Sequence, residues 1–421
     1  MLKSDVKYVD FVFLSNTIPE LDARLLHVFA YRLETQAGTL YSTTSIKNGF
    51  LLSGSCVLDG ELFVGPAFLD EPNGMKLKQQ QEISGSYTLI HLTPSSVTFN
   101  TDSFGLSKFY LYEKGGHYIV GNNVMLLAAV IKEAQGTPPL NNVVLASQWV
   151  FPNTFGTQLN TEQLPLSGVR LLPSSNRLVC FSSELRTEVI APRIETTVLS
   201  EQEYWQKIES GCEEILTSVN AILNSQEYDE TVVNITGGRD SRMILPAMAC
   251  LGRVDEVVFR TSFRSQREDD IATSLVGYVG GKYDDFANVR NVEVQPEAVI
   301  RKQLYFKQGL YHDIKFPKVG TDFQRRKSVR LIGGCGEIYR TFYTSILRKQ
   351  FRDYHYAEKT GFMTWLKLLG KQKKSVDSVI HEFFNGFRLW DRFGVEPAIR
   401  DNAIDLLSAE LARLPGGYIV A

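Results

Sequence analysis

The stretch "VVNITGGRDSRMIL", residues 232–245, limits the fold of this chain more than any other segment. A β-branched apolar run ends at Thr236-Gly237-Gly238, a charged pair follows, and apolar residues resume after Ser241. A parallel strand that stops at a glycine-rich turn and feeds a helix directs backbone N–H groups and the positive end of the helix dipole at one point. The stretch therefore predicts a phosphate site at the end of a parallel strand.

The six residues of this turn have different expected roles. The glycine pair permits close backbone approach to a phosphate, and the two flanking hydroxyl groups add donors. A carboxylate is placed to help hold Mg2+, beside an arginine that either pairs with a second anion or points into solvent. The glycine pair is Gly237 and Gly238, and the flanking hydroxyl groups belong to Thr236 and Ser241. The carboxylate is that of Asp240, and the arginine is Arg239. An ordinary strand-to-helix turn with an N-cap is the competing interpretation.

The second half of the chain has an α/β pattern. Ser200 followed by Glu203 is a capping-box signature, so we expect a new domain to begin near residue 200. Strand-like runs ("ETVVNIT", "DEVVFRTS", "VRLIGG") then alternate with helical stretches ("DSRMILPAMACL", "DDIATSLVGYVGG"), which predicts a parallel sheet. Pro246 is expected to bend its helix about one turn in. After residue 340 the pattern is mainly helical.

The first half of the chain, from about residue 7 to residue 190, is rich in strands. Short alternating runs such as "NGFLLSGSCVLDGELFVG" are bounded by Gly, Asn, Asp or Pro. Helical spacing is confined to "ELDARLLHVFAYRLE" and "NVMLLAAVIKEA". We expect two packed sheets with accompanying helices.

Composition argues against several classes of function. The formal net charge of −2 over 421 residues provides no global basic field for nucleic acid. The five cysteines (Cys56, Cys180, Cys212, Cys250 and Cys335) are scattered and never form C-x-x-C, which argues against a disulfide framework and a structural zinc site. No run approaches the ~18 apolar residues of a membrane helix, and the charged N-terminal segment does not resemble a signal peptide. We expect a cytoplasmic protein with no nucleic-acid or membrane partner.

The string "TGGRDS" resembles the S-G-G-x-D-S pyrophosphate loop of the ATP pyrophosphatases, with Thr236 in place of the serine. The "GGRDSR" form is similar to the asparagine-synthetase branch, which includes β-lactam synthetases and lasso-peptide cyclases. The resemblance implies that residues 200–421 form an ATP pyrophosphatase domain with a parallel sheet of the adenine-nucleotide α-hydrolase type and a helical C-terminal part. It also implies that ATP and Mg2+ bind there, with Thr261 among the nucleotide-binding residues.

The resemblance extends into the first half of the chain. "ISGSYTLIHL" and "VTFNTDSFGLSKFYLYEKGGHYIVGNN" are similar to the family's glutaminase-type domain, where G-x-(F/Y) leads to D-x-x-G and an aromatic pair. This implies an Ntn-type α+β sandwich over residues 1–195. Glutaminase activity in the family needs a cysteine at the start of the mature chain, whereas Met1 is followed here by Leu2 and Lys3. Cys56 is better explained as a buried apolar residue, so we expect a domain that does not hydrolyse glutamine.

A second motif, "LIGGCGEIYRTFY", resembles the family's second phosphate and metal motif, but Gly336-Glu337 stands where the family has Asp-Glu. Glu337 would then hold the metal with Asp240 and join Ser241 and Arg239 as a catalytic residue. The competing interpretation is a solvated glutamate at a helix start. The family's late catalytic lysine is not identifiable.

The resemblance implies an AMP-forming ligase that adenylates a substrate carboxylate, releases pyrophosphate and forms an amide with an amine. Its partners would be small-molecule or peptide carboxylates and amines, and a homodimer is compatible with it. Two alternatives remain. A nucleotide-binding regulatory pseudoenzyme of the same fold is favoured by the missing aspartate and lysine. A nucleotidyl-activating, thiolation-type pyrophosphatase is disfavoured because paired catalytic cysteines are absent from the sequence.

Overall fold

The computed structural model of the chain describes residues 10–15, 19–46, 48–65, 70–79, 83–102, 105–136, 139–141, 162–164, 166–173, 176–182, 184–189, 199–236, 241–261, 266–284 and 328–333. These residues form a mixed α/β structure with two six-stranded antiparallel sheets and one four-stranded parallel sheet. The structure confirms the predicted strand-rich first half and the predicted parallel sheet in the second half.

The first sheet has the strand order β10-β8-β9-β1-β3-β2. Its strands are β1 (Phe11–Leu14), β2 (Tyr31–Thr35), β3 (Gly38–Ser42), β8 (Tyr110–Lys114), β9 (His117–Gly121) and β10 (Val169–Leu171). All of its pairs are antiparallel. Short turns such as Gly115-Gly116, both at positive φ, join neighbouring strands.

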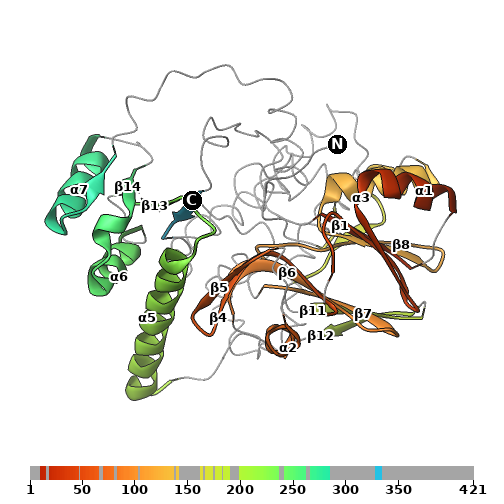
Figure 1. Cartoon of the computed structure of the whole chain (residues 1–421), viewed down its shortest axis with the longest axis horizontal. Coiled ribbons are helices and arrows are strands. Elements are labelled where there is room, and N and C mark those ends of the chain that lie inside the picture. Colours follow the sequence, from red (N-terminus) through yellow and green to blue (C-terminus); the bar gives the residue numbers. More distant parts are fainter. Residues whose placement is uncertain are drawn as a thin grey trace, which may run out of the picture.

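The second sheet has the order β12-β11-β7-β6-β4-β5. Its strands are β4 (Phe50–Leu58), β5 (Glu61–Val64), β6 (Ser84–Leu92), β7 (Ser96–Thr101), β11 (Asn176–Phe181) and β12 (Glu184–Val189). Helices α1 (Pro19–Val28) and α3 (Val124–Gln135) cover the outer face of the first sheet, and α2 (Glu71–Gln79) covers that of the second (Figure 1). The first half is therefore a helix–sheet–sheet–helix sandwich.

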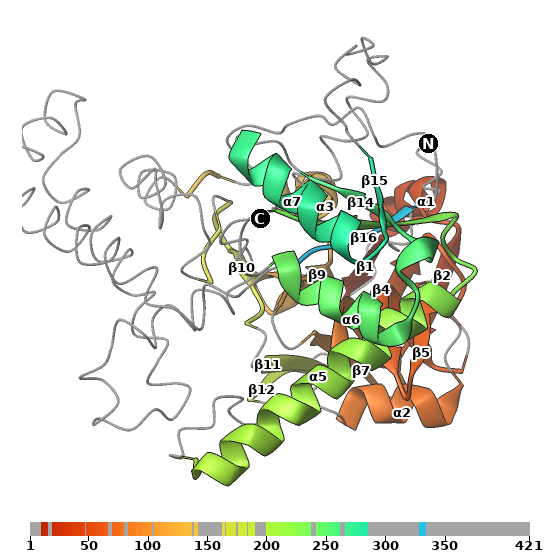
Figure 2. The ribbon, with the colours of Figure 1, turned by 90° about the vertical axis from the view of Figure 1, so that its left-hand side faces the viewer.

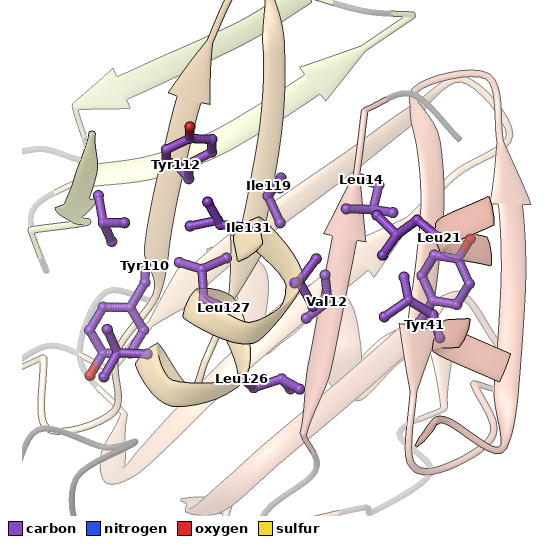
Figure 3. Close-up of a cluster of buried hydrophobic side chains, with 14 of the residues drawn as sticks. Val12, Leu14, Leu21, Tyr41, Tyr110, Tyr112, Ile119, Leu126, Leu127 and Ile131 are labelled. Carbon is purple, nitrogen blue, oxygen red and sulfur yellow. The ribbon is translucent and has the colours of Figure 1, made fainter. Parts of the chain in front are cut away.

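Alternation along the strands builds the cores of this sandwich. Leu40 packs between the two sheets with Phe13 and Phe99, whereas its neighbour Tyr41 points to the other face. There Tyr41 joins the cluster beneath α1 and α3, where Val12 also lies (Figure 3). Because alternate side chains of a strand point to opposite faces, both faces of the first sheet are buried in apolar cores.

Two predictions about helices need correction. The helical pattern "ELDARLLHVFAYRLE" is too long, because α1 ends at Val28 and Tyr31–Thr35 forms β2. The sequence reading also missed α2, because Pro72 and Gly74 are poor helix formers. The reason for Gly74 is packing, since a Cβ added there would lie 2.5 Å from Cδ2 of Phe50.

The parallel sheet has the order β15-β14-β13-β16. Its strands are β13 (Glu230–Asn234), β14 (Val258–Arg260), β15 (Lys282–Tyr283) and β16 (Ser328–Leu331). All three pairs are parallel, with Val233 aligned to both Phe259 and Leu331. The predicted parallel sheet is confirmed for the strands that follow residue 229.

Helices α5 (Glu201–Asn224), α6 (Ile244–Leu251) and α7 (Gln266–Tyr278) pack on one face of this sheet (Figure 2). The capping box that opens α5 is confirmed, because Ser200 and Glu203 bond to each other's backbone N–H. α5 also contacts the first half of the chain, where Glu214 accepts a hydrogen bond from Ser84 Oγ. None of the described helices has the length and apolar composition needed to span a membrane.

The predicted bend at Pro246 is wrong. A 3-10 turn over Ser241–Met243 precedes α6, so the α-helix itself begins only at Ile244. Pro246 therefore lies in the first helical turn, where backbone N–H groups have no partner within the helix. The proline limits where the helix starts and removes no internal hydrogen bond.

Candidate functional site

The candidate site lies where three parallel strands end. β13 is flanked by β14 and β16, so the chain leaves β13 toward one side of the sheet and later returns to the other side. Parallel strands end at the same edge, and ligands of open α/β sheets bind outside the carboxyl ends of strands at such a reversal of strand order. The residues that follow β13, β14 and β16 therefore form the candidate site.

Thr236 and Ser241 are joined by hydrogen bonds at this edge. Their hydroxyl oxygens lie 2.8 Å apart, and the backbone N–H of Thr236 donates to Ser241 Oγ at 2.9 Å. Ser241 Oγ also lies 3.3 Å from the carbonyl oxygen of Thr236. The two ends of the "TGGRDS" string thus meet, and both predicted hydroxyl donors are brought together beside β13.

Thr261 follows β14 directly, next to this pair. Arg260 O accepts a hydrogen bond from the backbone N–H of Ile235 at 2.8 Å, which ties the end of β14 to the residue before Thr236. Thr261 Oγ1 is buried, and no group in the described part of the chain forms a hydrogen bond with it. A buried hydroxyl without a partner has a free-energy cost, which a ligand oxygen at this edge would remove.

The start of α6 adds to the donor character of the edge. Met243 occupies the N-cap position, and no side chain caps the helix there. The first backbone N–H groups of a helix have no internal acceptor and favour negative charge. The 3-10 turn that begins at Ser241 runs directly into α6, so the positive end of this helical segment lies at the hydroxyl pair and favours negative charge there.

Five predicted site residues lie outside the described residues. They are the loop residues Gly237, Gly238, Arg239 and Asp240, and the proposed metal ligand Glu337. The helical region expected after residue 340 lies outside them as well. Within the described ranges, no group of three or more His, Cys, Asp or Glu side chains is arranged as a metal site.

Sequence reading missed a charged cluster on the adjacent strands. Arg260 donates from Nε to Asp284 at 3.1 Å, and its Nη2 lies 3.6 Å from Glu230 Oε1. The alternation of β14 offered the only signal, because Arg260 follows buried Phe259 in a strand of three residues. The Arg260 side chain lies on the face opposite Phe259 and reaches back toward Glu230, the first residue of β13.

The motifs of the first half also meet in space. Asp102 opens the "DSFG" string and accepts hydrogen bonds from the backbone N–H groups of Leu106, Ser107 and Tyr87, at 3.0, 2.8 and 3.4 Å. Tyr87 belongs to the "GSY" string, so the carboxylate links the two strings. Burial raises the pKa of Asp102, and these N–H donors oppose the rise.

Lys108 is almost completely buried and donates to the carbonyl oxygen of Leu106 at 3.2 Å. Burial lowers the pKa of this amine to about 8, and the nearby Asp102 carboxylate opposes that shift. The predicted burial of Cys56 is confirmed at 1% exposure, and burial raises the pKa of its thiol to about 12. Cys56 therefore lacks the thiolate that a nucleophile requires.

Comparison with known proteins gives little beyond this geometry. The sequence matches no known protein family and no curated protein. A solved structure described as the allosteric regulatory enzyme of purine biosynthesis aligns with a TM-score of 0.26 at 10% identity, over 66% of this chain and 80% of that chain. Glutamine phosphoribosylpyrophosphate amidotransferase from B. subtilis, complexed with ADP and GMP, aligns with a TM-score of 0.24 at 11% identity, over 81% of this chain and 78% of that chain. Scores this low do not establish a shared fold.

Proposed function

We propose that this chain is an ATP-dependent, AMP-forming ligase of the asparagine-synthetase type. The observation that carries the proposal is the hydroxyl pair of Thr236 and Ser241, which lies at the reversal of strand order and encloses a glycine-rich string. The buried hydroxyl of Thr261 at the next strand end fits the same ligand chemistry, because phosphate oxygens accept hydrogen bonds. The proposed fold is an Ntn-type sandwich followed by an adenine-nucleotide α-hydrolase-like sheet.

In the proposed reaction, a substrate carboxylate attacks the α-phosphorus of ATP, and the bond to the β-phosphate oxygen breaks. Thr236 and Ser241 hold the departing pyrophosphate through hydroxyl hydrogen bonds, with Arg239 as a further charge partner. An amine then attacks the acyl-adenylate, and AMP leaves as the amide forms. The residues of the chain contribute positioning and charge stabilisation. Bound Mg2+ would neutralise phosphate charge, with Asp240 and Glu337 as its proposed ligands.

Exchange of labelled pyrophosphate into ATP tests the first half of this reaction. A panel of amino-acid and peptide carboxylates is supplied without an amine acceptor, so that only adenylation and its reversal occur. We expect Ser241→Ala to lower exchange about ten- to a hundredfold, since hydrogen bonds to charged groups contribute roughly 1.5–3 kcal/mol.

Ser274→Ala is the matched control, because Ser274 Oγ is exposed and donates to the carbonyl of Asp270 in the same helix, at 2.8 Å. An active wild type whose exchange is unaffected by Ser241→Ala would show that the loop assignment is wrong. Wild-type protein that binds ATP in calorimetry but gives no exchange with any carboxylate would favour the regulatory pseudoenzyme.

Glu337→Gln tests the proposed metal ligand separately. If Glu337 completes a Mg2+ site with Asp240, the substitution raises the Mg2+ concentration needed for half-maximal exchange and leaves metal-free ATP binding nearly unchanged. The same Mg2+ profile in the variant and in an active wild type would assign Glu337 to a structural role.

A further inference from the structure

β2 is the outermost strand of the first sheet. In the described part of the chain, this strand pairs with β3 alone. Tyr31 and Leu33 alternate on one face and remain 46% and 40% exposed. An edge strand with exposed apolar side chains is a template for pairing with another strand.

The hairpin geometry determines which backbone groups point away from the sheet. Thr35 and Gly38 are paired across the two-residue turn Gln36-Ala37, so they form the hydrogen-bonded pair that closes the hairpin. Hydrogen-bonded and non-hydrogen-bonded pairs alternate along an antiparallel ladder. The N–H and C=O groups of Arg32 and Glu34 therefore point outward, and those of Leu33 point toward β3.

We propose that β2 pairs antiparallel with β2 of a second copy of this chain, on a two-fold axis that passes beside Leu33. In this register the outward backbone groups of Arg32 meet those of Glu34 in the partner, and the reverse pair forms by symmetry. The side chains of these two residues then lie opposite each other across the new strand pair. The strand is self-complementary in both backbone hydrogen bonds and charge.

The charges and the apolar residues favour this register. Asp22 Oδ1 accepts a hydrogen bond from Arg32 Nε at 2.7 Å, and Glu34 Oε1 of the same strand accepts one from Arg32 Nη2 at 2.5 Å. Both charges are therefore held at the edge before a partner arrives, and the partner's pair adds to this intrachain pair. On the opposite face, Leu33 is aligned with Leu40, which is fully buried between the two sheets. Pairing across the axis places Leu33 against its symmetry mate, so the apolar row that begins at Leu40 continues into the second copy.

Sedimentation equilibrium of the full chain tests the proposal. We expect a wild-type mass near twice the 47.5 kDa of one chain at micromolar concentration. In a Glu34→Arg dimer, Arg32 of each chain would face an arginine at position 34 of the other chain. In a Leu33→Lys dimer, two lysines would face each other on the two-fold axis. Each substitution should weaken dimerisation at least about tenfold. Leu140→Lys is the matched control, because Leu140 is a 59% exposed leucine elsewhere on the surface.

Two further measurements are specific to this register. Amide hydrogen exchange at Arg32 and Glu34 should slow as the wild-type concentration rises, whereas Leu33 should be protected at every concentration. Mixing Glu34→Arg chains with Arg32→Glu chains restores both charge pairs, so the mixture should recover the dimer mass. A monomeric wild type, a dimer that resists both β2 substitutions, or a mixture of folded variants that stays monomeric would each overturn the proposal.

Discussion

The carboxylate of Asp102 accepts a hydrogen bond from the backbone N–H of Ser107 at 2.8 Å, inside the sandwich and away from solvent. Leu106 and Tyr87 donate to the same carboxylate. Asp102→Asn turns part of this acceptor into a donor and leaves at least one buried N–H unsatisfied. We expect the free energy of unfolding to fall by about 2–4 kcal/mol, measured by urea denaturation at pH 7.

The control for this substitution is Asp59→Asn. Asp59 is an exposed turn residue at φ +52°, a conformation that asparagine also tolerates. It should change stability by no more than about 0.5 kcal/mol. Equal effects of the two substitutions would show that Asp102 does not hold its loop through these hydrogen bonds.

Lys108 gives a pH-dependent prediction. Its folded pKa of about 8 lies below the unfolded value of about 10.4. Below pH 8 both states carry the proton, and the folded state bears the full cost of a buried charge. Between pH 8 and 10 the unfolded chain binds more protons, so this cost falls as pH rises. We expect wild type to gain about 2 kcal/mol over Lys108→Met between pH 7 and 10.

Denaturant unfolding of both proteins at several pH values measures this gain. Comparison with Lys108→Met cancels the titration of tyrosines and other shared groups. Lys114→Met, at an exposed lysine of β8, controls for the loss of an ordinary lysine. A stability difference that stays flat from pH 7 to 10 would contradict the buried, easily deprotonated amine.

The reactivity of the cysteines provides a third prediction. Burial raises the thiol pKa of Cys56 and Cys180 to about 12, whereas Cys212 and Cys250 are exposed. In the native protein, iodoacetamide should label Cys212 and Cys250 and leave Cys56 unmodified, because the thiolate is the reactive form. Peptide mass spectrometry measures the labelling of each site. Rapid labelling of Cys56 in folded protein would reopen the question of a thiol nucleophile in the sandwich.

The sequence predicts an element well where local signals agree with tertiary packing. Ser200 and Glu203 predict the start of α5 because both partners of a capping box lie within one turn. Prediction from the sequence fails where tertiary packing outweighs the intrinsic secondary-structure propensity of the residues. Gly74 lies inside α2 because the ring of Phe50 leaves no room for a Cβ. The helical pattern expected to continue to Glu34 stops at Val28, because Tyr31–Thr35 pairs with β3 instead.

The candidate site, too, can be predicted from the sequence only where the signal is local. The glycine-rich string predicts the strand-to-helix turn, and the hydrogen bonds between Thr236 and Ser241 bring its two ends together. The cluster around Arg260 depends on strand order, which places Glu230 and Asp284 on either side of it. No local pattern encodes that order, because parallel neighbours are distant in sequence.

Thr261 yields a prediction in which stability and binding change in opposite directions. Its buried Oγ1 has no hydrogen-bond partner in the described part of the chain, so the ligand-free protein bears a desolvation cost. Thr261→Val keeps the shape and the β-branch and removes the hydroxyl, so we expect the free energy of unfolding without ligand to rise by about 1 kcal/mol. If the hydroxyl meets a nucleotide oxygen, the same variant should bind ATP about tenfold more weakly in calorimetry. Thr273→Val, at an exposed threonine of α7, should alter neither quantity beyond experimental error. A Thr261→Val protein that is less stable than wild type and binds ATP equally well would assign this hydroxyl to the fold and remove Thr261 from the nucleotide site.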